Sequence, residues 1–180
     1  MHRVTFYLLL AVVVAIGAAS PASAKHHSHP QLVLEAKSMV GVDGAFVGSA
    51  FPVRGVPGDD LPWTAPAKTS VRLMSNGALT ITVKGLLVED GPNTPADLVG
   101  TNPDATFRGL VSCVTEVNGA SAEVNVMTKP FKTNKHGDSR IVDKVALPTP
   151  CLAPIVMVIA GDRDEWFSMT GFESDESQSD

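Results

Sequence analysis

The chain has 180 residues, of which 44% are hydrophobic and 18% charged, and its formal net charge is −5. This length suits one domain and is enough to bury a core without several disulfides. The chain is mildly acidic and no stretch of it concentrates Lys and Arg, so it has little attraction for phosphate backbones and nucleic acid is not an expected partner.

The first 24 residues have the pattern of a secretory signal peptide. Residues 1–3 are a short basic start, residues 4–19 are an apolar stretch, and Ala22-Ser23-Ala24 supplies the small residues that signal peptidase reads. We expect cleavage between Ala24 and Lys25 and a secreted, periplasmic or cell-surface location. A retained signal anchor is the alternative interpretation.

Cleavage there would remove one base, Arg3, and no acid, which leaves 13 basic and 19 acidic residues and a formal charge of −6. The most apolar later run, residues 154–160, is far shorter than the roughly 20 residues that span a bilayer. We therefore expect no transmembrane segment after signal cleavage.

The chain has two cysteines, Cys113 and Cys151, which lie 38 positions apart. In an exported protein, two cysteines are expected to form one disulfide. Closing this loop stabilises the fold by about 4 kcal/mol in the chain-entropy description. Two free buried thiols are the alternative. The pair lacks the Cys-x-x-Cys spacing of a redox centre, which favours a structural role.

Alternating apolar residues and turn signals predict eight or nine short strands. The first begins near Leu32, residues 155–159 form an unbroken apolar run typical of a central strand covered on both faces, and residues 166–172 form the last strand. Residues 52–66 contain four prolines and predict an ordered loop across the sheet edge, pinned by Trp63. Residues 89–104 predict a crossover between two sheets.

Two Asn-Gly pairs predict two hairpins with different loops. Around Asn76-Gly77, a three-residue loop with Gly77 at positive φ keeps the apolar face intact, because it places Leu73 opposite Leu79. Around Asn118-Gly119, a two-residue type I′ turn does so, because it places Cys113 opposite Val124.

Together these elements predict an all-β fold: a two-sheet antiparallel β-sandwich over residues 31–172, immunoglobulin-like in general architecture, with one disulfide. Residues 25–30, Lys-His-His-Ser-His-Pro, are expected to form a flexible His-rich arm. Residues 173–180 are acidic and Ser-rich and predict a disordered tail.

Several short segments resemble small exported bacterial proteins of unassigned function. These segments are Asn102-Pro103 with Phe107-Arg108 and Val111-Ser112-Cys113, then residues 147–154 (Leu-Pro-Thr-Pro-Cys-Leu-Ala-Pro), then Trp166-Phe167 with Thr170-Gly171. The resemblance covers most of the chain from about residue 54 onward. The resemblance implies a secreted β-sandwich. Because the similar proteins have no assigned activity, it does not identify any catalytic residue.

The predicted mature N-terminus is a candidate site for copper or nickel. Cleavage after Ala24 places His27 third from a free amine, behind Lys25 and His26. The amine, two deprotonated amides and an imidazole form the square-planar nitrogen set that Cu²⁺ and Ni²⁺ prefer. The alternative is a His-rich arm that serves only as a soluble spacer.

A second candidate metal site is the acidic run of Asp162, Asp164 and Glu165, whose oxygens are of the type that binds Ca²⁺. Asp59 and Asp60 would contribute only if the fold brought the two loops together. The alternative is a solvated acidic turn.

Catalysis has little support in the sequence. His136 is the one histidine outside the N-terminal region, no Gly-x-Ser-x-Gly elbow is present, and Ser139 is too close along the chain for the usual activation by His136. A hydrolase therefore ranks third among the functions considered.

The loop that carries Asp59, Asp60 and Trp63 is the candidate ligand surface, together with the crossover at residues 89–104, because loops at the ends of sandwiches often carry function. Trp63 as a core or loop anchor is the alternative. The sequence thus predicts a secreted, non-enzymatic binding or structural module for an extracellular ligand or protein. Extracytoplasmic copper or nickel binding is the second hypothesis, and no other cofactor is expected.

Overall fold

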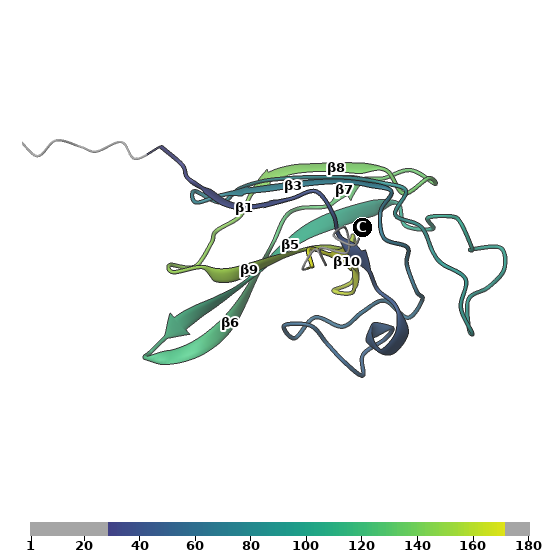
Figure 1. Ribbon diagram of the computed structural model, residues 1–180, viewed down its shortest axis with the longest axis horizontal. Helices are drawn as coiled ribbons and strands as arrows, with labels where there is room; N and C mark the ends of the chain where they lie inside the picture. The colour runs from purple at the N-terminus through teal and green to yellow at the C-terminus, as the bar shows by residue number, and fades with distance from the viewer. Residues whose placement is uncertain (1–28, 172–180) are drawn as a thin grey trace, which may run out of the picture.

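The computed structural model describes residues 29–171, which form ten strands in two antiparallel sheets (Figure 1). The four-stranded sheet has the order β1 (Leu32–Ala36), β3 (Lys68–Met74), β4 (Ala78–Lys84) and β8 (Ser139–Lys144). The other sheet has the order β2 (Val40–Gly41), β10 (Trp166–Met169), β9 (Leu152–Ala160), β5 (Thr106–Val117) and β6 (Ala120–Met127), and β7 (Phe131–Lys132) also pairs with β5.

The predicted antiparallel sandwich is confirmed, with ten strands in place of eight or nine. β2 and β7 have two residues each, too few to show an alternating pattern in the sequence. Within residues 29–171 the helical structure is one 3₁₀ turn, Gly44–Phe46, and no helix there is long and apolar enough to cross a membrane. The predicted signal peptide, most of the His-rich arm and the acidic tail lie outside the described residues.

The core lies between the two sheets. Alternate residues of β3 and β4 point inward and are fully buried, among them Leu73, Leu79 and Ile81, and β5 faces them. At Gly109 of β5, an added Cβ would lie 2.8 Å from Ile81 Cδ1, so the sheets are in close contact there. Burying each large apolar side chain contributes about 1.5–3 kcal/mol.

Both predicted hairpin registers are confirmed. In the β3–β4 hairpin Leu73 pairs with Leu79, and Gly77 has a φ of +83°. In the β5–β6 hairpin Cys113 pairs with Val124. Asn118 and Gly119 there have φ values of +53° and +79°, the two positive values that a type I′ turn requires.

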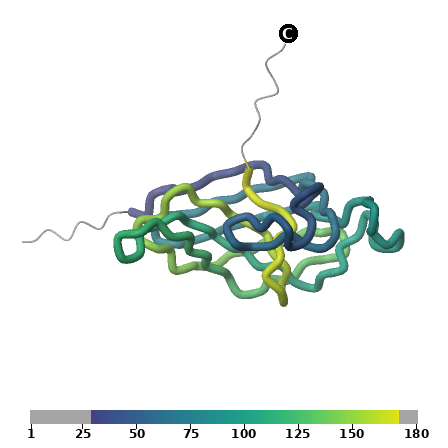
Figure 2. The backbone as a smooth tube through the Cα atoms, turned by 90° about the horizontal axis from the view of Figure 1, so that it is seen from below, coloured from purple at the N-terminus to yellow at the C-terminus, as the bar shows by residue number. Residues whose placement is uncertain are grey.

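Strand β9 is central, and its second half is covered on both faces, as predicted for the apolar run at residues 155–159, although Ile155 is only half-buried. Residues 156–160 are all fully buried, which requires a layer on the side away from the four-stranded sheet as well. The loop over residues 42–66 supplies part of that layer: Phe46 packs against Trp166 at 6.3 Å between ring centroids, and Arg54 hydrogen-bonds to Ala153 of β9 and Asn125 of β6. This loop passes beneath the six-stranded sheet in Figure 1 and in front of it in Figure 2.

The predicted disulfide is present. Cys113 and Cys151 are joined with an S–S distance of 2.02 Å and their Cα atoms are 5.0 Å apart. Cys113 lies on β5 and Cys151 immediately precedes β9, so the bond links neighbouring strands of one sheet and closes a loop of 38 residues.

Candidate functional site

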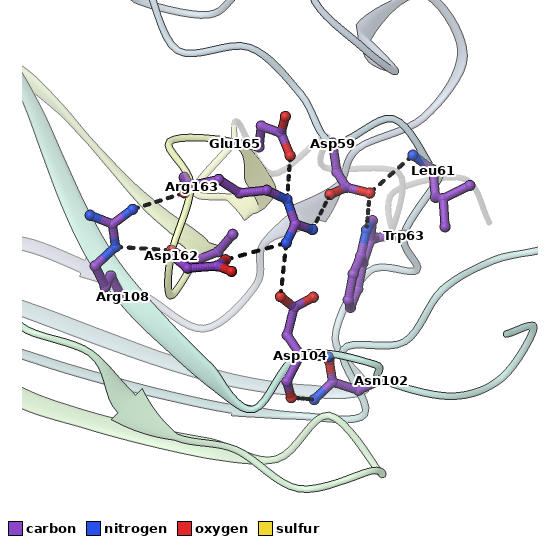
Figure 3. A network of polar contacts seen from close by, with 10 residues as sticks. Asp59, Leu61, Trp63, Asn102, Asp104, Arg108, Asp162, Arg163 and Glu165 are labelled. Atoms are coloured by element: carbon purple, nitrogen blue, oxygen red, sulfur yellow. Dashed lines mark hydrogen bonds and ion pairs between the residues drawn. The ribbon is translucent and has the colours of Figure 1, made fainter.

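Three loops meet at one end of the sandwich around Arg163 (Figure 3). Arg163 lies in the turn between β9 and β10. Its Nη2 donates to Asp59 Oδ2 at 2.8 Å, and its Nη1 donates to Asp104 Oδ1 at 3.1 Å and lies 3.4 Å from Asp162 Oδ1. Its Nε donates to Glu165 Oε2 at 2.5 Å. We call these five residues the Arg163 cluster.

The cluster is anchored to the core through Asp59 and Trp63. Asp59 is 4% exposed, and its Oδ1 accepts hydrogen bonds from the indole Nε1 of Trp63 at 3.1 Å and the amide of Leu61 at 3.0 Å. Trp63 is 1% exposed and stacks on Phe167 with ring centroids 4.0 Å apart. The expectation that Asp59 and Trp63 belong to a ligand surface is therefore corrected: a buried indole N–H needs an acceptor, and Asp59 is that acceptor.

Burial and charge act in opposite directions on the ionisable groups of the cluster. Burial raises the pKa of Asp104 above its usual value, and the positive charge of Arg163 only partly offsets this effect. Burial alone would lower the pKa of Arg163, but hydrogen bonds to Asp59 and Glu165 and the charge of Asp104 outweigh it, so that pKa is raised. Arg163 therefore stays charged and neutralises carboxylates that water reaches poorly.

The candidate calcium ligands Asp162, Asp164 and Glu165 do not converge on one point. Asp162 and Glu165 contact Arg163, whereas Asp164 pairs with Arg108 at 2.7 Å. Within residues 29–171, no three His, Cys, Asp or Glu side chains are grouped so that they could hold a metal ion. The fold does bring Asp59 to this turn. However, the acids there surround the guanidinium groups of Arg163 and Arg108, and these groups, not a metal ion, balance their negative charge.

Beside the cluster, the loop at residues 42–66 and the crossover at residues 89–104 enclose a hollow of about 280 Å³. It is lined by Asp43, Gly44, Val47, Asp60, Pro62 and residues 90–93 (Asp-Gly-Pro-Asn), and we call it the acidic hollow. The Glu89 amide donates to the Pro62 carbonyl at 2.8 Å, and an added Cβ at Gly91 would lie 2.9 Å from Pro62 Cγ, so the two loops are in direct contact. Both loops predicted as the ligand surface thus line one concavity.

The acidic hollow carries uncompensated negative charge. Asp43, Asp60 and Asp90 are all exposed, and no basic residue is among those that line the hollow. Asp43 Oδ1 accepts a hydrogen bond from the amide of Gly44 and caps the 3₁₀ turn, which fixes the position of its carboxylate. Of the predicted ligand residues, Asp60 is the one that the structure places at this surface.

His136 and Ser139 do not form a nucleophile and base pair. The Ser139 hydroxyl donates to the Lys132 carbonyl at 3.0 Å, and His136 is exposed in a turn that the Asn134 side chain stabilises through the His136 and Asp138 amides. The proposed copper ligands Lys25, His26 and His27 lie outside the described residues. Comparisons with protein-family models, with curated proteins and with solved structures find no match for this chain.

Proposed function

We propose that this chain is an exported, non-enzymatic binding module that receives a cationic group of its ligand in the acidic hollow. The observation that carries the proposal is the hollow itself, in which two loops far apart in sequence place three carboxylates, Asp43, Asp60 and Asp90, around one concavity. Loops held on a rigid β scaffold are a common place for binding sites.

The chemistry of the lining supports a ligand with an amine or guanidinium on an apolar stem. A cation 4 Å from one carboxylate gains about 1 kcal/mol in water and about 4 kcal/mol in the reduced dielectric near a protein surface. Val47, Pro62 and the proline of residues 90–93 provide apolar wall for the methylene groups of such a stem. A lysine or arginine side chain of a partner protein has this combination.

The proposed location is consistent with the covalent structure. The bond between Cys113 and Cys151 suits an oxidising compartment outside the cytoplasm. The resemblance to small exported bacterial proteins and the signal-peptide pattern of residues 1–24 point the same way.

The test is calorimetric titration of the mature protein with a tri-lysine peptide, with tri-glutamate as the control ligand. The double variant Asp60→Asn/Asp90→Asn should weaken tri-lysine binding roughly tenfold or more, since tenfold corresponds to about 1.4 kcal/mol shared between two carboxylates. The matched control is Asp97→Asn/Glu116→Gln, which also removes two negative charges from exposed residues that do not line the hollow. Equal affinity in the wild type and the double variant, or no preference for tri-lysine over tri-glutamate, would refute the proposal.

A further inference from the structure

The outer face of the four-stranded sheet gathers positive charge from strands that are far apart in the sequence. Val71, Ile81 and Ile141 point into the core, so the residues that alternate with them point outward. The outward residues include five exposed cations: Lys68 and Arg72 on β3, Lys84 on β4, and Arg140 and Lys144 on β8. We call this surface the cationic face.

Three of these cations form a row across the sheet. Lys68 pairs directly with Lys84, and Arg140 lies on the next strand, where it pairs with Thr82. Neighbouring strands are about 4.8 Å apart, so Lys68 and Lys84 are separated by one strand spacing. Arg140 lies two residues out of register with Lys84 and is its diagonal neighbour, at roughly 7–8 Å. An antiparallel β-bridge between Thr133 and Ser139 places Lys132 of β7 next to Arg140, at the end of the row.

Few acids lie near the row. Glu35 of β1 is paired in register with Arg72, at the other end of β3 from Lys68. The Asp138 carboxylate lies close to the row, but it is half-buried and accepts hydrogen bonds from the Gly85 amide and the Asn134 side chain. Neither acid forms an ion pair with a cation of the row in the described part of the chain.

The cations of this face do not stabilise the fold through ion pairs within the described residues. The ion pairs among residues 29–171 involve Arg54, Arg108 and Arg163, and none of them includes a residue of the cationic face. Two lysines directly opposite each other on neighbouring strands destabilise a sheet. In a chain with a net charge of −5, a positive row that costs stability and forms no ion pair among residues 29–171 is better explained by an external anionic partner.

We propose that the cationic face binds a linear acidic polysaccharide that lies across the strands. Ser70, Thr80 and Thr82 share the face with the cations and offer hydroxyls that hydrogen-bond to sugar hydroxyls. None of the described residues on this face is aromatic, so bases have no side chain to stack on. The large exposed apolar side chains on this face are Val142, 50% exposed, and Leu32, 46% exposed and paired with Met74 at the edge strand β1. Two such side chains provide too little apolar surface for insertion into a bilayer.

This inference concerns a surface on the sheet opposite the one that carries the acidic hollow, and it does not depend on the proposed function. The sequence showed no Lys/Arg cluster because each strand contributes only one or two cations. Sheet formation brings together residues 68, 84 and 140.

The test measures binding of the mature protein to polygalacturonate, which carries one carboxylate per sugar ring, with neutral dextran as the blank. The variant Lys68→Gln/Lys84→Gln/Arg140→Gln should bind at least tenfold more weakly and with a shallower dependence on salt. The matched control, Lys37→Gln/Lys129→Gln/Lys135→Gln, removes the same charge from exposed residues outside the row and should bind like the wild type. Thermal unfolding should show that the face variant is folded and no less stable than the wild type, because a like-charge pair is relieved.

Three results would overturn the proposal. Polygalacturonate binding could be unchanged in the face variant, or it could fall equally in the matched control. Alternatively, duplex DNA or vesicles of anionic phospholipid could bind more tightly than polygalacturonate at the same ionic strength, which would assign the face to another class of polyanion.

Discussion

Replacing Arg163 with methionine removes the guanidinium that neutralises two poorly solvated carboxylates, while it keeps a long apolar stem beside Phe167. The side chains of Asp59 and Asp104 are only 6% and 10% exposed, so neither carboxylate regains full hydration when Arg163 is lost. The substitution therefore tests whether the Arg163 cluster holds the three loops in place.

The expected cost follows from the exposure of each group. Breaking a buried ion pair by removing one partner costs about 3–5 kcal/mol, whereas exposed pairs contribute about 0–1 kcal/mol. Arg163 is 42% exposed, which lets water approach, and Asp59 keeps its hydrogen bonds from Trp63 and Leu61. We therefore expect Arg163→Met to lower the free energy of unfolding by about 2–3 kcal/mol at neutral pH, between these limits.

The loss should depend on pH. Burial already raises the pKa of Asp104 above the value of 3.8 that applies when the chain is unfolded, and removing Arg163 takes away the charge that opposes this rise. A carboxyl with a raised folded-state pKa contributes stability that is fully present below its unfolded pKa and is lost as the pH rises through its folded pKa. The deficit of Arg163→Met relative to the wild type should therefore be largest at pH 7 and shrink as the pH falls toward 3.8.

The assay is urea unfolding of the oxidised protein at several pH values, followed by tryptophan fluorescence. The variant Asp59→Asn/Asp104→Asn/Arg163→Met should recover much of the lost stability, because it replaces the two least exposed carboxylates with neutral amides. Asp162 and Glu165 keep their charge, but their side chains are more exposed, 83% and 28%. A cost below about 0.5 kcal/mol, as for a surface substitution, would refute the reasoning. A deficit independent of pH, or no recovery in the triple variant, would do so too.

Two further predictions concern a turn and the N-terminal arm. Gly77→Ala should destabilise the fold well beyond the roughly 1–2 kcal/mol of a left-handed alanine, because its Cβ would lie 1.9 Å from the Val145 carbonyl oxygen. Gly119→Ala, at a φ of +79° with open space around it, should show only the smaller cost in the same urea assay. If the mature chain begins with residues 25–27, it should bind Cu²⁺ tightly, and N-terminal acetylation should abolish that binding. Equal affinity of the free and acetylated proteins in a competitive Cu²⁺ titration would contradict the proposed site.

Features that depend on local pattern were predictable from the sequence. The registers of both hairpins followed from keeping one apolar face intact, which a shift of one residue would destroy. The pairing of Cys113 with Cys151 followed because there are only two cysteines. The burial of residues 156–160 of β9 on both faces followed from the unbroken apolar run. Two-residue strands such as β2 and β7 are too short to produce a pattern.

The candidate sites were only partly predictable. The loop with Asp60 and the crossover were identified as a ligand surface, but sequence reasoning did not show that Asp43 joins them, because its position depends on the 3₁₀ turn packing beside Asp60. Trp63 was considered both as a ligand-surface residue and as an anchor of its loop, and the structure shows the anchor: the indole is buried in the core. Asp59, considered for the ligand surface, accepts the hydrogen bond of the indole N–H.

The sequence alone therefore determined the fold class, the disulfide, the hairpin registers and the loops that bear the hollow, since each depends on alternation, turn chemistry or residue counts within a short stretch. Only the tertiary structure decided which charges meet. Arg163 and Asp59 are 104 positions apart, and the cations of the row come from β3, β4 and β8. Electrostatic interactions depend on distance in space, and the strand order that sets these distances is not encoded in any one segment.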